Sequence, residues 1–200
     1  MAISKITSFK QIFLTFDDGP SVPFTDQILD ILKEYKVPAS FFVCGKNAER
    51  YPEIARRIMR DGHTIGNHSY SHSRFLSLMG CLSGEIEKTQ DVIQNITGVG
   101  AKFFRPPYGY VRPWLKNYLG KKDYQLVLWD IQIYDWQKPP AAILVKRALQ
   151  KIRPNVVILL HDGDGTRPLC DRSQTVLALP SIIQSFKERG YEFGKIQQTL

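Results

Sequence analysis

The chain has 200 residues, of which 43% are hydrophobic and 23% are charged, and 27 Lys and Arg against 19 Asp and Glu give a net charge of +8. These values suit one folded domain with a substantial core and exclude a largely disordered chain. The charge favours polyanions, but the basic residues are dispersed and form no recognition motif, so we expect no nucleic-acid partner. No segment approaches the roughly 18 apolar residues of a membrane-spanning helix.

Short apolar runs alternate with longer amphipathic stretches along the chain, which is typical of repeated strand and helix units. In chain order we predict strand 12–16, helix 25–35, strand 39–43, helix 52–60, strand 63–66, helix 84–96, strands 102–104 and 125–129, helix 141–152, strand 156–160, helix 174–189 and strand 191–193. About seven strands with intervening helices favour a closed or nearly closed parallel barrel, with an open doubly wound sheet as the alternative.

The domain organisation follows from the same pattern. We expect residues 1–11 to form an N-terminal extension and residues 12–200 to form a single domain, which we expect to be a monomer. Residues 1–10 lack the apolar stretch of a signal peptide, which leaves the compartment open, inside or outside the cytoplasm.

Two adjacent carboxylates, Asp17 and Asp18, directly follow the first predicted strand. In parallel barrels the loops at the carboxyl ends of the strands carry the chemistry. Two carboxylates that leave a buried strand together repel each other unless a cation or a proton lies between them, so the pair indicates a metal site. An ordinary turn at Asp18-Gly19 is the alternative, and the Asp-Gly pair taken alone favours that turn over a metal site.

Two of the four histidines, His68 and His72, are separated by four positions. On one helical turn this spacing brings both imidazoles to the same side, where each can offer a neutral nitrogen to a divalent ion. One carboxylate added to two histidines leaves coordination positions free for water and substrate. A pair of surface histidines on a helix is the alternative explanation.

Three further polar segments lie at the ends of predicted strands, at residues 105–109, 130–136 and 159–163. Arg105 begins a stiff Pro-rich loop and is placed to pair with a carboxylate, while a backbone N–H near Tyr108 is placed to face a developing oxyanion; an exposed Pro-rich turn is the alternative. His161 follows the strand 156–160 and is a candidate general acid, because a nearby carboxylate such as Asp135 raises the pKa of an imidazole. A purely structural histidine is the alternative there.

Five motifs in this order resemble the polysaccharide deacetylase family, the NodB-like group also called carbohydrate esterase family 4. They are T-F-D-D-G-P at residues 15–20, H-S-x-x-H at 68–72, R-P-P-Y-G at 105–109, D-W at 135–136 and L-L-H-D at 159–162. The resemblance extends from about residue 12 to the carboxyl end of the chain. It implies an α/β fold, a single-domain distorted (β/α) barrel with seven or eight parallel strands.

The resemblance also implies a cofactor and a base. Asp18, His68 and His72 would bind one divalent metal ion, zinc or another transition metal such as cobalt. Asp17 would be the general base that takes a proton from a water activated by the ion, and Arg105 would position Asp17.

The remaining roles implied by the resemblance concern the leaving group and the acetyl group. His161, tuned by Asp135, would protonate the leaving amine, and the Tyr108 backbone N–H would help to hold the oxyanion. Trp136 and Leu159 would form the apolar wall around the acetyl methyl group. The expected partner is an N-acetylated glycan, either a chitin oligomer or peptidoglycan.

Two rival functions stay open on the sequence. Another metal hydrolase on a similar barrel, such as a phosphoesterase or an ester-cleaving xylan deacetylase, would use the same kind of ion. A glycan-binding protein that has lost catalysis is expected to have a broken metal triad or a missing acid, whereas this chain contains every one of those residues.

Overall fold

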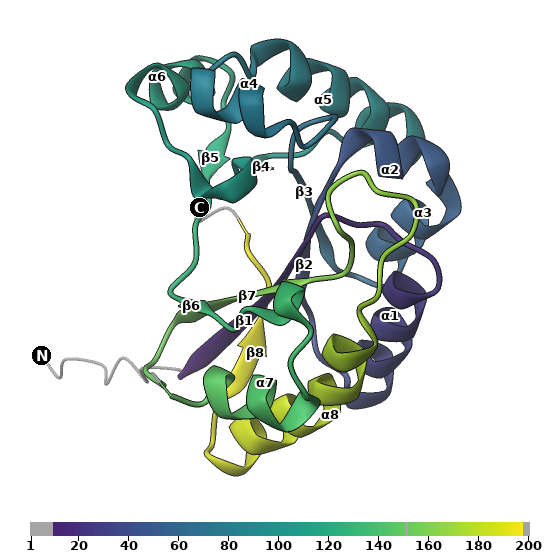
Figure 1. Ribbon diagram of the computed structural model, residues 1–200, viewed down its shortest axis with the longest axis vertical. Helices are drawn as coiled ribbons and strands as arrows, with labels where there is room; N and C mark the ends of the chain where they lie inside the picture. Colours follow the sequence, from purple (N-terminus) through teal and green to yellow (C-terminus); the bar gives the residue numbers. More distant parts are fainter. Residues whose placement is uncertain (1–9, 151, 198–200) are drawn as a thin grey trace, which may run out of the picture.

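The computed structural model describes residues 10–150 and 152–197, so most of the expected extension at residues 1–11 lies outside the described part. A curled parallel sheet runs through the molecule in the order β5-β4-β3-β2-β1-β7-β6, and β8 also pairs with β1 (Figure 1). Its strands are β1 (Gln11–Asp17), β2 (Ser40–Val43), β3 (Thr64–Asn67), β4 (Phe103–Phe104), β5 (Gln125–Leu126), β6 (Ile131–Gln132), β7 (Val156–His161) and β8 (Glu192–Gly194). The predicted distorted (β/α) barrel is therefore confirmed.

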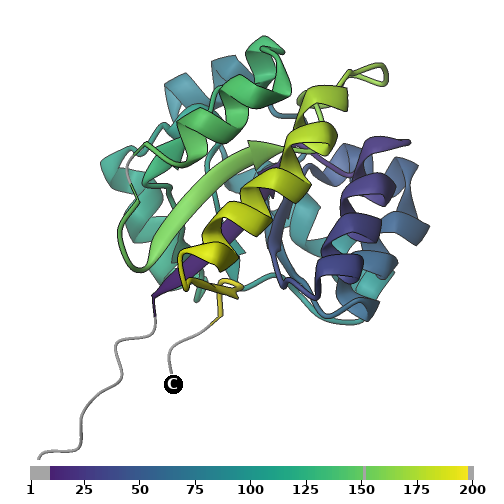
Figure 2. The same ribbon diagram turned by 90° about the horizontal axis from the view of Figure 1, so that it is seen from below.

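Helices cover the convex side of this sheet and form an arc around it (Figure 1). They are α1 (Phe24–Tyr35), α2 (Gly45–Arg50), α3 (Pro52–Arg60), α4 (Arg74–Met79), α5 (Ser83–Thr97), α6 (Pro113–Lys121), α7 (Ala141–Ala148) and α8 (Ser173–Glu188), with short 3-10 turns η1 (Pro107–Gly109) and η2 (Asp135–Gln137). The view from below shows α8 lying across the sheet beside α7 (Figure 2). No helix within the described residues is long and apolar enough to cross a membrane.

The core lies between the sheet and the helices. Ile12, Leu14 and Phe16 alternate along β1, are fully buried and face the helices, because side chains two positions apart share one face of a strand. On α1 the inward-facing side chains Ile28 and Leu32 are also fully buried. Each such side chain contributes about 1.5–3 kcal/mol through removal of apolar surface from water. The opposite face of β1 carries Phe13 and, toward the carboxyl end of the strand, the polar side chains of Thr15 and Asp17.

Several elements differ from the sequence expectation. The short helices α2, α4 and α6 and the strand β6 are additional, and the predicted helix 141–152 ends at Ala148. The predicted strand 125–129 pairs only at Gln125 and Leu126. Beyond them, the carbonyl groups of Val127 and Leu128 accept hydrogen bonds from the Arg105 side chain, which occupies groups that a longer strand would offer to a neighbour.

A buried histidine at the amino ends of β2 and β3, away from the pocket, makes the stability of the fold depend on pH. His63 is 5% exposed, and its Nδ1 accepts a hydrogen bond from the Ala39 backbone N–H. Burial lowers its pKa from 6.5 to about 4. Below about pH 6.5 this histidine therefore binds a proton in the unfolded chain but stays neutral in the folded chain, and stability is lost as the pH falls toward 4.

Replacement of His63 by Gln removes this proton and keeps an acceptor for the Ala39 N–H. Between about pH 7.5 and pH 5 we expect the free energy of unfolding of the unaltered protein to fall by about 2 kcal/mol more than that of His63→Gln. Urea unfolding at the two pH values measures the difference. Parallel losses in the two proteins would show that His63 is not the group that titrates.

Candidate active site

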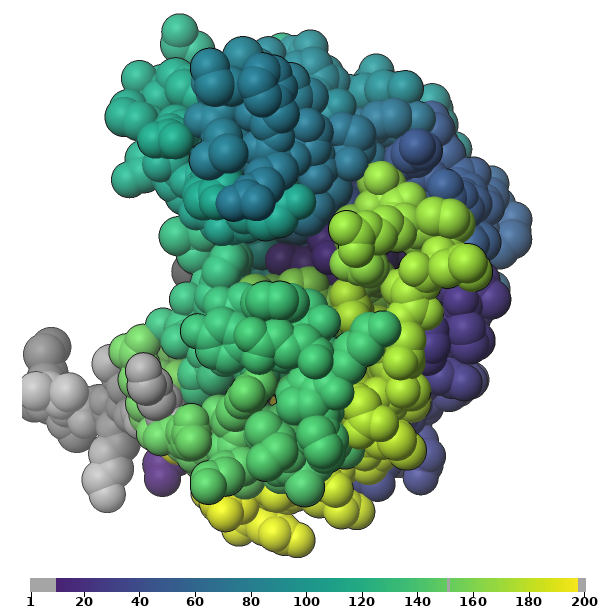
Figure 3. All heavy atoms as spheres, viewed as in Figure 1, coloured from purple at the N-terminus to yellow at the C-terminus, as the bar shows by residue number. Residues whose placement is uncertain are grey.

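A pocket of about 690 Å³ opens at the carboxyl ends of the strands. In the space-filling view it is a hollow between the part of the molecule that contains α4 and α6 and the part formed by the chain after β6 (Figure 3). All of the predicted metal-ligating residues line it, together with Asp17, Tyr108, Trp136, Leu159 and His161. Arg105 and Asp135 lie behind this surface, where each is buried and contacts one of the lining side chains.

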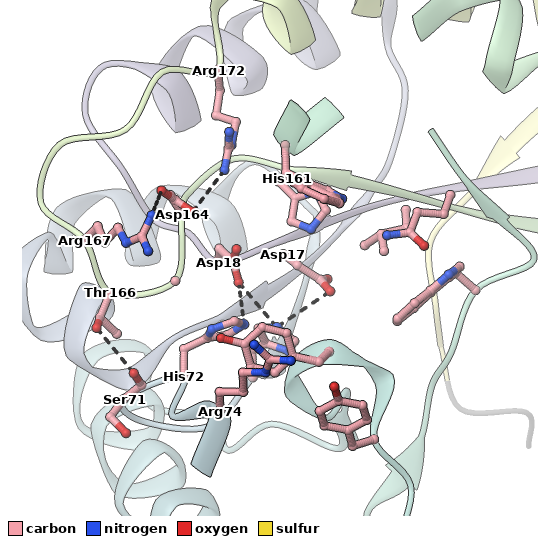
Figure 4. A pocket seen from close by; sticks show the side chains of 18 residues that line it. Asp17, Asp18, Ser71, His72, Arg74, His161, Asp164, Thr166, Arg167 and Arg172 are labelled. Carbon is pink, nitrogen blue, oxygen red and sulfur yellow. Dashed lines mark hydrogen bonds and ion pairs between the residues drawn. The ribbon is translucent and has the colours of Figure 1, made fainter. Parts of the chain in front are cut away.

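Asp18, His68 and His72 form a compact cluster, and their candidate ligand atoms all lie within 4.8 Å of one another (Figure 4). Asp18 Oδ1 lies 3.4 Å from His68 Nε2 and 3.1 Å from His72 Nε2. Asp18 has a left-handed backbone conformation, with φ of 76°, and turns its carboxylate away from the course of β1. A side chain at the following Gly19 would overlap Asp162 at the end of β7, so glycine permits this tight turn.

The cluster fits a divalent transition metal ion. Three atoms bound to one tetrahedral zinc at about 2.0–2.1 Å lie about 3.3 Å apart, close to the measured separations. Asp18 Oδ1 is buried and has no hydrogen-bond partner within the described residues, as expected of an atom that is reserved for an ion. His68 Nδ1 lies 2.7 Å from the Arg105 carbonyl oxygen, so this nitrogen carries the proton and Nε2 keeps a free lone pair toward Asp18.

A loop, and not the predicted helical turn, brings His68 and His72 together. Residues 68–72 are not helical, and both Ser69 and His72 have left-handed backbone conformations. The Ser69 N–H donates to Asn67 Oδ1, and the His72 N–H donates to Ser69 Oγ, so short side chains stabilise a loop in place of a helical turn. The predicted proximity is present, but the predicted helix is wrong.

Asp17 belongs to a buried polar chain on the inner face of β1. Thr15 and Asp17 are two positions apart, so both side chains point to the side of the strand opposite to Leu14 and Phe16. Arg105 Nη1 donates to Asp17 Oδ1 over 2.7 Å and to Thr15 Oγ1 over 2.9 Å. The Arg105 side chain is fully buried, and its guanidinium also packs against the Phe42 ring. These contacts fix the Asp17 carboxylate, whose Oδ2 lies 3.7 Å from His68 Nε2.

His161, at the pocket wall, pairs with the buried Asp135. His161 Nδ1 lies 2.7 Å from Asp135 Oδ1, and the His161 backbone N–H donates to Asp135 Oδ2 over 2.7 Å. Thr175 Oγ1 donates to the same Oδ2 over 2.9 Å, a contact that no sequence signal indicated. Burial lowers the pKa of His161, but the Asp135 carboxylate outweighs it and the pKa rises to about 9. His161 is therefore protonated at neutral pH, with Nε2 free on the pocket side.

Tyr108, Trp136 and Leu159 line the pocket around these groups. Leu159 is buried, whereas the Tyr108 and Trp136 side chains are about half exposed. Tyr108 has a left-handed backbone conformation, with φ of 60°, and its ring centroid lies 4.7 Å from that of His72. Within the described residues the Tyr108 backbone N–H forms no hydrogen bond, whereas the neighbouring Gly109 N–H donates to the Pro106 carbonyl. The Tyr108 N–H is therefore available as a donor in a residue that lines the pocket.

Other lining residues had not been predicted. Arg74, Trp129, Asp164, Arg167 and Arg172 also border the pocket. They lie in α4, between β5 and β6, and in the loop after β7. Their sequence surroundings contain no spacing that distinguishes a pocket residue from an ordinary surface residue, so only the assembled fold could have placed them.

Comparisons with known proteins agree with the fold and the motifs. The profile of the family described as "Polysaccharide deacetylase" matches residues 4–127. The chain is 36% identical over 184 residues to a peptidoglycan-N-acetylglucosamine deacetylase of Bacillus cereus, covering 92% of this chain and 66% of that protein, just under two thirds. It is 34% identical to a chitooligosaccharide deacetylase of Azorhizobium caulinodans, covering 90% of both chains.

A solved structure extends this similarity to three dimensions. The peptidoglycan deacetylase PdaC from Bacillus subtilis superposes with a TM-score of 0.83 at 34% identity, covering 94% of this chain and 88% of that one. The profile match includes the segments that carry Asp17, His68 and Arg105, and the sequence identity and the superposition each extend over at least 90% of the chain. The chain therefore belongs to the polysaccharide deacetylase family.

Proposed function

We propose that this protein is a metal-dependent hydrolase that removes N-acetyl groups from N-acetylglucosamine-type glycans, chitin oligomers or peptidoglycan, and releases acetate. The observation that carries the proposal is the convergence of a metal-type cluster, a fixed carboxylate and a protonated imidazole on one pocket. Relatives of the chain are named as peptidoglycan and chitooligosaccharide deacetylases, which supports the substrate class.

Asp18, His68 and His72 are the residues that would hold the ion, zinc or another transition metal such as cobalt. A bound divalent ion supplies a more acidic water and polarises the acetamide carbonyl. The protein prepares the site for it, because the Arg105 carbonyl fixes the His68 tautomer and the loop around Ser69 orients His72.

Asp17 is the proposed general base. Its Oδ1 is occupied by Arg105, so Oδ2, on the side of the metal-type cluster, is the oxygen left to accept a proton from water. Arg105 acts as a positioning residue, since it holds the carboxylate and the Thr15 hydroxyl at the same time. The tetrahedral oxyanion accepts a hydrogen bond from the Tyr108 backbone N–H, which has no other acceptor within the described residues.

His161 is the proposed general acid. Asp135 accepts the proton of Nδ1, so Nε2–H points to the pocket and can be given to the leaving amine as the C–N bond breaks. Acetate and a free amino sugar result. Leu159 and Trp136 provide the apolar wall for the acetyl methyl group, because both border the pocket next to His161 and η2.

The acid role predicts the pH dependence of the reaction. His161 must be protonated, so kcat/KM is expected to hold through neutral pH and to fall as the pH rises through about 9. Asp135→Asn removes the main charge that raises this pKa, and the fall is expected at lower pH. Asp130→Asn is the matched control, since Asp130 contacts Arg153 and the Val157 N–H but not His161. An unmoved alkaline limb in Asp135→Asn would refute the assignment of the acid.

A substrate panel tests the function itself. Acetate release should be measured with N-acetylglucosamine oligomers, peptidoglycan and acetylated xylan at equal concentrations of acetyl groups. We expect release from the N-acetylated glycans and much slower release from xylan, whose acetyl groups are linked through oxygen. Release from xylan alone would replace the proposal with an esterase. Binding of a glycan without any acetate release would indicate a protein that has lost catalysis.

A further inference from the structure

The carboxylates that line the pocket are already engaged. Asp17 pairs with Arg105 at 2.7 Å, and Asp18 faces the two histidines of the metal-type cluster. Asp164, in the loop after β7, contacts two arginines, as the dashed lines in Figure 4 show. None of these three acids is therefore left to neutralise further positive charge on the pocket walls.

The pocket contains more arginine side chains than carboxylates that are left to neutralise them. Arg167 lies 3.1 Å and Arg172 3.5 Å from the single carboxylate of Asp164. Arg172 is buried and also donates from Nε to the Gly163 carbonyl, so it anchors the loop. Arg74, the first residue of α4, is exposed and forms no ion pair within the described residues. A surplus of positive charge consequently faces the open part of the pocket from Arg74 and Arg167.

These two arginines border the same side of the pocket. Thr166, next to Arg167, donates a hydrogen bond from Oγ1 to the Ser71 carbonyl, which joins the loop after β7 to the segment that leads into Arg74. Helix α4, which begins at Arg74, contacts η1, which contains Tyr108. Tyr108 itself packs against His72, so the positive surface begins directly beside the metal-type cluster. A neutral N-acetylated oligomer offers hydroxyl and amide groups to this surface but no negative charge.

We propose that Arg74 and Arg167 recognise a carboxylate on a sugar next to the one that loses its acetyl group, so that the pocket selects acidic N-acetylated glycans over neutral ones. A guanidinium binds a carboxylate through two parallel hydrogen bonds, which a hydroxyl cannot reproduce. The proposal rests on the proposed deacetylase function and narrows its substrate. It favours peptidoglycan, whose muramic acid residues carry a lactyl carboxylate, over chitin oligomers.

The test uses two ligands with the same sugar backbone: a peptidoglycan tetrasaccharide of alternating N-acetylglucosamine and N-acetylmuramic acid, and its uncharged carboxyl methyl ester. Both are compared with the unaltered enzyme, Arg74→Gln, Arg167→Gln and Arg189→Gln. Arg189 follows α8, does not line the pocket and carries the same change of charge as a matched control. The readouts are kcat/KM for acetate release and, in proteins that also carry Asp17→Asn, the Kd from calorimetry.

For the acid form we expect Arg74→Gln to weaken binding and lower kcat/KM about fivefold, the size of an exposed charge-assisted contact. The methyl ester should be unaffected, Arg189→Gln should match the unaltered enzyme, and added salt should reduce the preference for the acid form. Equal affinity of the unaltered pocket for the two ligands, or equal losses for both in Arg74→Gln, would overturn the proposal. Absence of acetate from every glycan would instead overturn the deacetylase function, and the Kd values would still decide the recognition of the carboxylate.

Discussion

Replacement of Asp17 by Asn is expected to lower kcat about 10³-fold, because a positioned general base contributes roughly 10²- to 10⁴-fold. The amide oxygen can still accept the hydrogen bond from Arg105, but the amide does not take up a proton. The ligand cluster of Asp18, His68 and His72 is untouched by this change. Metal content should therefore stay at one ion per chain, while acetate release from an N-acetylglucosamine oligomer is lost.

Two controls separate this expected loss from a loss of folding. The variant leaves the buried Arg105 opposite a neutral group, so circular dichroism and the unfolding midpoint must accompany the kinetics. Asp123→Asn removes a carboxylate that pairs with Lys102 on the surface, and it is expected to keep full activity. Activity of Asp17→Asn near that of the unaltered enzyme would rule out Asp17 as the base.

Replacement of His72 by Ala is expected to weaken metal binding by more than 100-fold. Loss of a hydrogen-bond partner that orients a metal ligand already costs about 10- to 100-fold in metal affinity, and loss of the ligand itself costs more. His72 Nε2 lies 3.1 Å from Asp18 Oδ1, so its removal leaves only two donors in the cluster. Calorimetric titration of the metal-free proteins with zinc measures the change in Kd.

His63→Gln provides the comparison for that titration. It also removes one histidine, but His63 lies beside Ala39 at the other end of β2, away from the cluster. We expect its zinc affinity to equal that of the unaltered protein. An unchanged affinity in His72→Ala would show that the ion binds elsewhere or that His72 is not a ligand.

The sequence was sufficient for the larger elements of the fold. The apolar runs that form β1 and β7 are long and buried on both sides, so their hydrophobicity alone marks them. The two-residue strand β6 and the six-residue helices α2 and α4 contain too few residues for a period to emerge. The end of β5 depended on Arg105, a residue about twenty positions away, whose side chain bonds the carbonyls that follow Leu126.

Site residues could be predicted from the sequence wherever polar residues interrupt or end an apolar run. Asp17 and His161 stand at the ends of buried strands, and this position along the sequence is enough to mark both as candidates. The loop geometry of residues 68–72 was not readable, because it depends on the side chains of Asn67 and Ser69. Arg74 and Arg167 were missed for a related reason: only the tertiary structure brings α4 and the loop after β7 to the same pocket.

The most direct test of the proposed function is the dependence of acetate release on the metal. The protein should be stripped with a chelator, assayed with an N-acetylglucosamine oligomer, and assayed again after addition of one equivalent of zinc or cobalt. We expect no acetate from the stripped protein, recovery at one equivalent, and no recovery in His72→Ala at the same metal concentration. Unchanged acetate release by the stripped protein would contradict the central claim that Asp18, His68 and His72 hold a catalytic ion.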